Sequence, residues 1–291
     1  MKISPLPTLG LAALLAVGLV PQASAGLFSS NIDMLVVAER QGGGASPQGG
    51  TPTYAAFDGG YIEAGDPIAG DTPPSADQVR RSLDAAMANQ GFQASGASPS
   101  VVLTYHWGVL RIDRIQIRAP YGIKSNLQAR IELVSTQQLG AEVENHIVAG
   151  EKGGTMNSDA SSPPFLVGAA ETVREDSRQP RIFVIVSAYD YQGLTHREAK
   201  LLWRVKLSAR EQSGDMDEVI PALIAGGAPY FGKDLPDVKT VEVTPSGASR
   251  APGAPAEAVT PASLNLDGQF MDGLLKNEHD SFSGATGTFQ G

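Results

Sequence analysis

The sequence predicts an α+β protein, with a mainly antiparallel sheet, helices packed on one face, and flanking flexible segments rich in Gly, Pro and Ala. Three observations lead to this class. Residues 181–189 are apolar on both faces of a strand, residues 201–207 alternate between two faces, and residues 75–90 have helical spacing. Such runs and alternation are typical of strands, and their order along the chain indicates a sheet covered by helices.

The chain begins with a segment that predicts export. A single basic residue precedes an uncharged apolar run over residues 9–20, and Ala-Ser-Ala ends at position 25. This arrangement is typical of a secretory signal peptide over residues 1–25, cleaved between Ala25 and Gly26. The predicted location is therefore the periplasm or the extracellular space.

Composition excludes some kinds of membrane anchor and disfavours some kinds of partner. The chain has no cysteine, so it offers no disulfide, no thiolate metal ligand and no lipid attachment site after the predicted cleavage. Its net charge of -9 disfavours nucleic acid and anionic lipid as partners. No later apolar stretch reaches the roughly 20 residues of a membrane helix. We expect a released protein, not lipid-anchored, with no integral membrane segment after cleavage.

The mature chain divides into a domain and a tail. Residues 26–243 are predicted as a single α+β domain, interrupted by flexible loops at 41–53 and 151–164 that are rich in Gly, Pro and Ser. Residues 244–291 are predicted as a low-complexity tail, because their Pro/Ala-rich start buries too little apolar surface to offset chain entropy. Within the tail, residues 264–275 have the spacing of a short helix.

The first half of the domain predicts two strands, a helix and a third strand. Residues 34–38 are a short apolar run, and residues 54–57 are a second strand candidate. Ser75 can cap a helix over residues 75–90, in which apolar residues four apart share one face. Residues 100–111 are rich in β-branched and aromatic side chains, which favours a strand.

The second half contains the predicted hairpin. Residues 125–148 keep three-to-four apolar spacing and predict a helix. Residues 181–189 are apolar on both faces, as in an interior strand of a covered sheet. Residues 201–210 alternate, so Arg204 and Lys206 fall on a face predicted to be mostly solvated. Two strands joined by a short turn are expected to pair. A helix over residues 215–230 and an edge strand over residues 238–243 are predicted to follow.

The hairpin and the helix after it resemble a family of bacterial envelope proteins catalogued only as a domain of unknown function. The matching pieces are VIVSAYD at residues 184–190, Leu202-Trp203-Arg204, and the helix over residues 219–231. The unit over residues 75–105 also fits. Many members look like small lipoproteins, whereas this chain lacks the lipoprotein cysteine, and its segment 112–180 is long for the family. The resemblance implies an α+β fold and an envelope location, with no known activity.

His106 is the candidate catalytic residue. It lies on the strand face shared with Val102, Thr104 and Leu110, where an imidazole could act as a general base or bind a metal ion. No second histidine is near it in the sequence. The alternative interpretation is a structural histidine whose ring nitrogens are satisfied within the core.

A second group of candidates lies at the hairpin turn. Tyr189, Asp190 and Tyr191, with His196 nearby, could line a small binding site. Turn chemistry explains Asp190 equally well, because aspartate side chains bond to nearby backbone amides in turns.

Known motifs for metals and cofactors are not matched. Asn265 and Asp267 resemble part of a calcium loop, but Ser263 and Leu274 occupy the positions of its first and closing ligands. Motifs for a nucleophile elbow, a phosphate loop, a dinucleotide site and a zinc protease are also missing from the sequence. We therefore expect no cofactor and no metal.

These observations predict a secreted or periplasmic envelope protein that acts as a non-enzymatic binding or structural module, with an envelope protein as partner. The alternative is a hydrolase or small-ligand enzyme that uses His106. A third hypothesis makes residues 264–291 a docking peptide. No pattern identifies the ligand or the oligomeric state.

Overall fold

The computed structural model describes residues 31–41, 51–66, 68, 72–112, 126–137, 139–140, 164–245 and 259–283. The predicted signal peptide and its cleavage site at Ala25 and Gly26, and most of the predicted loops at 41–53 and 151–164, lie outside these residues.

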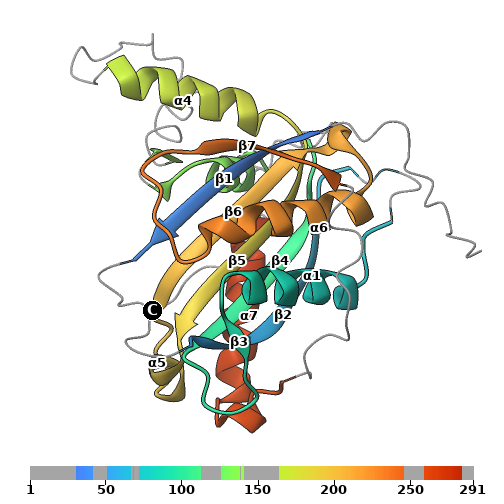
Figure 1. Ribbon diagram of the computed structural model, residues 1–291. Helices are drawn as coiled ribbons and strands as arrows, with labels where there is room; N and C mark the ends of the chain where they lie inside the picture. Colours follow the sequence, from blue (N-terminus) through green and yellow to red (C-terminus); the bar gives the residue numbers. More distant parts are fainter. Residues whose placement is uncertain are drawn as a thin grey trace, which may run out of the picture.

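The described residues form one seven-stranded sheet (Figure 1). Its strand order is β3-β2-β4-β5-β6-β1-β7, so the predicted hairpin occupies the centre. The strands are β1 (Ile32–Arg40), β2 (Thr53–Ala64), β3 (Gln93–Ala94), β4 (Val101–Leu110), β5 (Arg181–Asp190), β6 (Leu201–Arg210) and β7 (Lys239–Val243).

The sheet is mixed, which corrects part of the predicted fold class. The pairs β4–β5, β5–β6, β6–β1 and β1–β7 are antiparallel, as expected. Strand β2 instead pairs parallel with both β3 and β4. The physical reason is the helix between β2 and β4. This crossover carries the chain back to the end of the sheet at which β2 began, so β4 runs in the same direction as β2. The α+β content is confirmed, and an all-antiparallel sheet is excluded.

Six α-helices accompany the sheet in the described part of the chain. They are α1 (Ala76–Asn89), α2 (Asn126–Val134), α4 (Pro164–Ser177), α5 (Tyr191–Thr195), α6 (Met216–Gly227) and α7 (Gly268–Ser283). None of them is long and apolar enough to cross a membrane. Helix α4 was not predicted, because it follows directly on the Gly/Ser/Pro-rich stretch.

Helices α1 and α6 cover one side of the sheet, here called the first face (Figure 1). Ser75 caps α1 as predicted, with its side chain accepting a hydrogen bond from the Gln78 amide at 3.3 Å. The apolar residues predicted four apart on one face of α1, which are Val79, Leu83 and Met87, are buried against the sheet. Helix α6 adds Leu223 and its neighbours to the same core. This face is a continuous apolar core.

Helices α2 and α7 cover the opposite side, here called the second face. Helices on only one face were expected, and this expectation is wrong. The apolar residues of β5 on both faces already require cover on both sides. The predicted solvated face of β6 is likewise covered, since Lys206 is 5% exposed and Ser208 is 1% exposed.

The C-terminal residues take part in this second layer. The short helix expected at 264–275 corresponds to α7, which begins and ends later in the sequence. Residues 259–283 contribute Leu264, Met271 and Phe282 to the core of the second face. The Pro/Ala-rich composition of the preceding segment gave no indication of this contribution. The helix predicted over residues 125–148 ends as α2 at Val134, and residues 141–148 lie outside the described residues.

Candidate functional site

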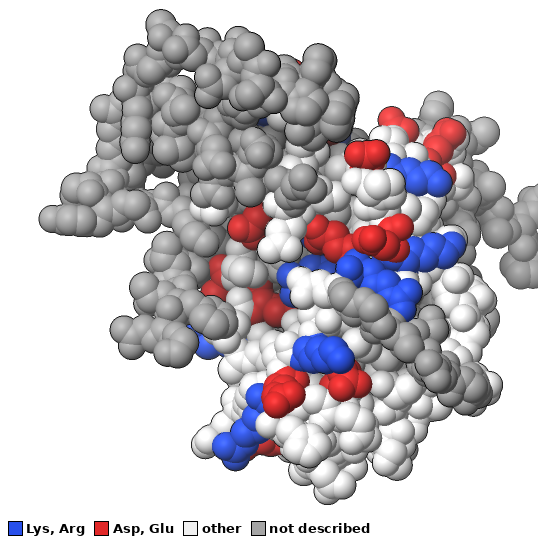
Figure 2. All heavy atoms as spheres, turned by 90° about the vertical axis from the view of Figure 1, so that its left-hand side faces the viewer, with Lys and Arg blue, Asp and Glu red and all other residues white. Residues whose placement is uncertain are grey.

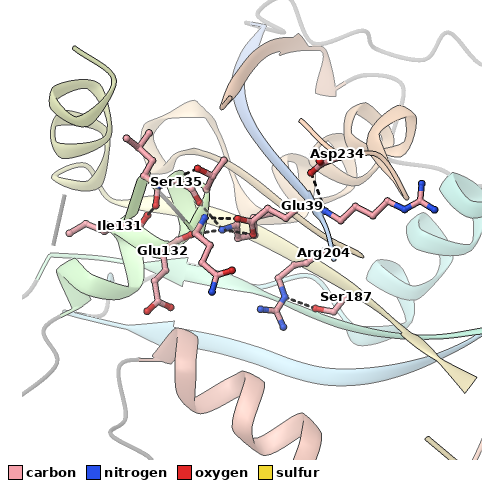
Figure 3. Close-up of polar contacts among 12 residues, drawn as sticks. Glu39, Ile131, Glu132, Ser135, Ser187, Arg204 and Asp234 are labelled. Carbon is pink, nitrogen blue, oxygen red and sulfur yellow. Dashed lines mark hydrogen bonds and ion pairs between the residues drawn. The ribbon is translucent and has the colours of Figure 1, made fainter. Parts of the chain in front are cut away.

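A row of polar side chains crosses the centre of the second face. Thr104 on β4 is directly opposite Ser187 on β5, which is directly opposite Arg204 on β6. Side chains at directly opposed positions project to the same face of a sheet. Arg204 Nε donates a hydrogen bond to Ser187 Oγ at 2.9 Å, as Figure 3 shows. His106 lies two residues beyond Thr104 and therefore on the same face.

Glu278 of α7 projects onto this row and accepts hydrogen bonds from three strands. Its Oε2 accepts from Thr104 Oγ1 at 2.6 Å, and its Oε1 accepts from Tyr189 Oη at 2.8 Å and from Arg204 Nη2 at 2.8 Å. The Glu278 side chain is 5% exposed. These four residues and His106 are called the Glu278 cluster.

His106 is enclosed within the Glu278 cluster. Its side chain is 0% exposed, and Nε2 lies 3.5 Å from Glu278 Oε2, too far for a strong hydrogen bond. Gly59, in the bulge of β2, packs directly on the ring, since a Cβ there would fall 2.1 Å from His106 Cε1. Within the described part of the chain, neither ring nitrogen has a hydrogen-bond partner of good geometry. In this conformation, a substrate cannot reach the imidazole.

The electrostatics of the cluster favour an ionised carboxylate. Burial raises the pKa of Glu278, but the His106 imidazole, the positive charge of Arg204 and the Thr104 hydroxyl outweigh it and lower the pKa to about 2. Burial lowers the pKa of Arg204, and the carboxylate beside it reverses the shift, so the net pKa is raised. Burial, followed by the carboxylate of Glu278, raises the pKa of Tyr189, whose hydroxyl therefore stays protonated and donates.

The four binding candidates at the hairpin turn do not form one site. Tyr189 joins the Glu278 cluster. Asp190 caps α5, because its Oδ2 accepts from the Gly193 amide at 3.0 Å. Tyr191 donates from its hydroxyl to the Leu264 carbonyl at 3.1 Å. His196 is exposed, and its Nδ1 lies 2.8 Å from the carbonyl of Gln192 in its own turn.

An open hollow of about 420 Å³ adjoins the cluster. Tyr189 belongs to both, and Leu274 of α7 also lines the hollow. The lining residues are Gln41, Tyr189, Ala199, Lys200, Leu201 and Leu274. The hollow therefore opens along one flank of α7.

Lys206 holds a second helix on the same face. Its Nζ donates to the carbonyls of Glu132 at 2.8 Å and Ser135 at 2.7 Å, and it lies 3.3 Å from Glu39 Oε2 (Figure 3). Carbonyls at a helix C-terminus lack partners within the helix, so the ammonium satisfies the end of α2. Burial lowers the pKa of Lys206, and Glu39 opposes that shift.

The residues that resembled a calcium loop have a structural role. Asp267 directly precedes α7, and its Oδ1 accepts a hydrogen bond from the Phe270 amide at 3.0 Å. Its carboxylate also forms an ion pair with Arg197 at 2.5 Å. No group of three metal-binding side chains occurs among the residues that the structure describes.

Glu278 is the residue that sequence reasoning missed. It lies in a predicted tail, and its partners are distant in sequence. One signal was present in the chain: Met271, Glu278 and Phe282 follow helical spacing, so an acidic residue interrupts an apolar stripe. An acid in that position indicates a buried polar partner on the surface that the helix covers.

Comparisons with known proteins give distant structural likenesses. No family model matches the chain, and no curated protein matches it. A PelC L103M dodecamer from Paraburkholderia phytofirmans is 10% identical, covering 67% of this chain and 96% of that chain with a TM-score of 0.28. A PDZ domain protein from Parabacteroides distasonis is 9% identical, covering 74% of this chain and 40% of that chain with a TM-score of 0.37. Both TM-scores are too low to equate the folds.

Proposed function

We propose that this protein is a non-enzymatic binding or structural module of the bacterial cell envelope, exported by its signal peptide, not lipid-anchored, and partnered by another envelope protein. The observation that carries this proposal is the Glu278 cluster. Its residue types are those of catalytic sites, yet Glu278 of α7 meets His106 of the sheet in the buried contact between the two. They attach a helix to the sheet, whereas a catalytic group must contact a substrate.

Export is supported by the sequence of the first 25 residues and is tested by protein chemistry. The full chain, expressed in a Gram-negative host, should yield mature protein that begins at Gly26 in the periplasmic or extracellular fraction. The variant Ala25→Arg should block cleavage and keep the protein with the membrane, because the peptidase requires a small residue there. Uncleaved wild-type protein in the cytoplasm would refute the proposed location.

The absence of catalysis is tested with generic substrates. Purified wild-type chain and His106→Ala should both leave ester, glycoside and phosphate substrates unchanged above the buffer rate. The control Glu278→Gln should behave in the same way. Turnover by wild type that is lost in His106→Ala would replace the binding module with a hydrolase.

One observation favours that second candidate. The distance of 3.5 Å between His106 and Glu278 resembles the pairing of a general base with the carboxylate that orients it. A hydrolase of this kind would have to open α7 before each turnover, since α7 supplies the carboxylate and also closes the site. We therefore rank it below the binding module.

A further inference from the structure

Helix α7 packs on the sheet through one amphipathic face. Of its 16 residues, Met271, Glu278 and Phe282 are buried, and Phe270, Leu274 and Leu275 are partly buried against the same core. Met271 packs in one apolar cluster of the second face, Phe282 packs in another, and Glu278 lies between them. The helix therefore contacts the sheet as a peptide ligand would, with an acid between two apolar anchors.

The donors that meet Glu278 beneath α7 all come from the strands. Thr104, Ser187 and Arg204 are aligned by the register of three central strands, and Arg204 is held in place by its bond to Ser187. Tyr189 follows on the same strand face. A hydroxyl pair and a guanidinium that converge on one point form a preorganised carboxylate site, which loses little conformational entropy on binding.

Two further features place this site within reach of a second molecule. The hollow beside Tyr189 and Leu274 leaves one flank of α7 open to solvent. The nitrogens of His106 are buried without hydrogen-bond partners of good geometry in the described part of the chain, and Nε2 lies 3.5 Å from Glu278 Oε2, so a carboxylate placed closer to the ring would gain a shorter hydrogen bond.

We propose that α7 is an exchangeable intramolecular ligand of a carboxylate-binding site on the second face, and that the partner presents an amphipathic helix of the same pattern. This inference rests on the proposed function and specifies its partner. The pattern is an apolar residue at position i, an acid at i+7 and an aromatic residue at i+11, as in Met271, Glu278 and Phe282. Displacement of α7 frees the site for the partner's acid.

The charge distribution makes the recognition local. The chain carries a net charge of -9, and acidic and basic side chains lie beside one another on the face drawn in Figure 2. Long-range attraction of an acidic helix is therefore not expected. Affinity should come from the buried contact with Arg204 and should depend only weakly on salt, because buried pairs are screened little.

The test is a titration with a labelled peptide. A fluorescent peptide of residues 266–283 is added to the full chain carrying Glu278→Gln, whose own α7 lacks the acid, and anisotropy is recorded. The matched control peptide has Gln at position 278. The acidic peptide should bind at least about tenfold more tightly, because hydrogen bonds to a charged group are stronger than neutral ones.

Two double variants test whether the preference for the acidic peptide comes from the carboxylate site. Adding Arg204→Met to Glu278→Gln should remove most of the preference for the acidic peptide. Adding Tyr189→Phe, which keeps the packed ring and removes one donor, should reduce the preference severalfold. Each chain is first checked for a cooperative melt, so that Tyr189→Phe still tests the site if Arg204→Met does not fold.

Three results would overturn the proposal. These are equal binding of the two peptides, no binding to a folded Glu278→Gln chain, and a preference that survives both site variants. A wild-type dimer that the free peptide dissociates would also overturn it, because the occupant would be a second copy of this chain. Failure here is distinguishable from failure of the proposed function, which is decided by export and turnover measurements.

Discussion

The two faces of the sheet are held by different interactions, although the same strands supply both. On the first face, α1 and α6 pack through apolar side chains such as Leu83 and Leu223. On the second face, α7 and α2 also pack on apolar clusters, and Glu278 and Lys206 hold them in addition through bonds to specific atoms. Apolar burial is strong and non-directional, whereas buried charge pairs are directional and depend on protonation. Both faces therefore bury apolar side chains, and the second face adds two buried charged side chains that bond to specific atoms.

The largest effect is expected on the first face. Leu83→Ala removes a side chain that is 1% exposed, and should lower the free energy of unfolding by about 4 kcal/mol through lost burial and the cavity left behind. Urea denaturation measures the change, with the exposed Asn89→Ala of the same helix as control. The loss should be the same at pH 7 and pH 4. A loss below that of the control would show that α1 is not part of the cooperative core.

The next effect is expected on the second face. Glu278→Gln keeps the shape of the side chain but removes its charge, and should lower the free energy of unfolding by about 3 kcal/mol. Hydrogen exchange should show α7 losing protection before the central strands. The control is Asp272→Asn on the exposed side of α7, expected to change stability by less than about 0.5 kcal/mol. Equal effects of the two substitutions would contradict the role given to Glu278.

Sequence reasoning reached the first face more completely than the second. The stripe of α1, its Ser75 cap and the hairpin of β5 and β6 are local patterns, and each was predicted. The parallel pairing of β2 with β4 also follows from the helix between them, although it was not predicted. Hydrophobic periodicity predicts these elements because each pattern lies within about 10 to 15 consecutive residues.

The Glu278 cluster could be predicted only in part. His106 and Thr104 were placed correctly on one strand face, and Tyr189 was named as a binding candidate. Glu278 itself is separated from its hydrogen-bond partners by 74, 89 and 174 residues. Strand order and register decide whether such residues meet, and no local pattern specifies them. The polar positions of β6 were therefore interpreted as solvated when they are covered.

Acidification should reduce the stability that Glu278 contributes on the second face and leave the apolar packing of the first face unchanged. The folded pKa of Glu278 is about 2, below its ordinary value of 4.5, so its contribution is complete above about pH 4.5 and is lost as the pH falls toward 2. About 2 kcal/mol of the difference between wild type and Glu278→Gln should disappear by pH 3. Urea denaturation of both chains from pH 7 to pH 3 measures this. A constant difference would mean that Glu278 titrates alike in the folded and unfolded states, so that folding does not lower its pKa.

The smallest effect tests whether burial, and not charge alone, makes Glu278 important. Lys276 forms an ion pair with Asp280 one turn along α7, and its side chain is 74% exposed. Lys276→Gln should change the free energy of unfolding by less than about 0.5 kcal/mol, because solvent screens an exposed pair and the side chains pay entropy to form it. Added salt should reduce even that change. A loss comparable to that of Glu278→Gln would mean that charged side chains hold α7 along its whole length. The difference between the two faces would then come from overall charge and not from one buried carboxylate.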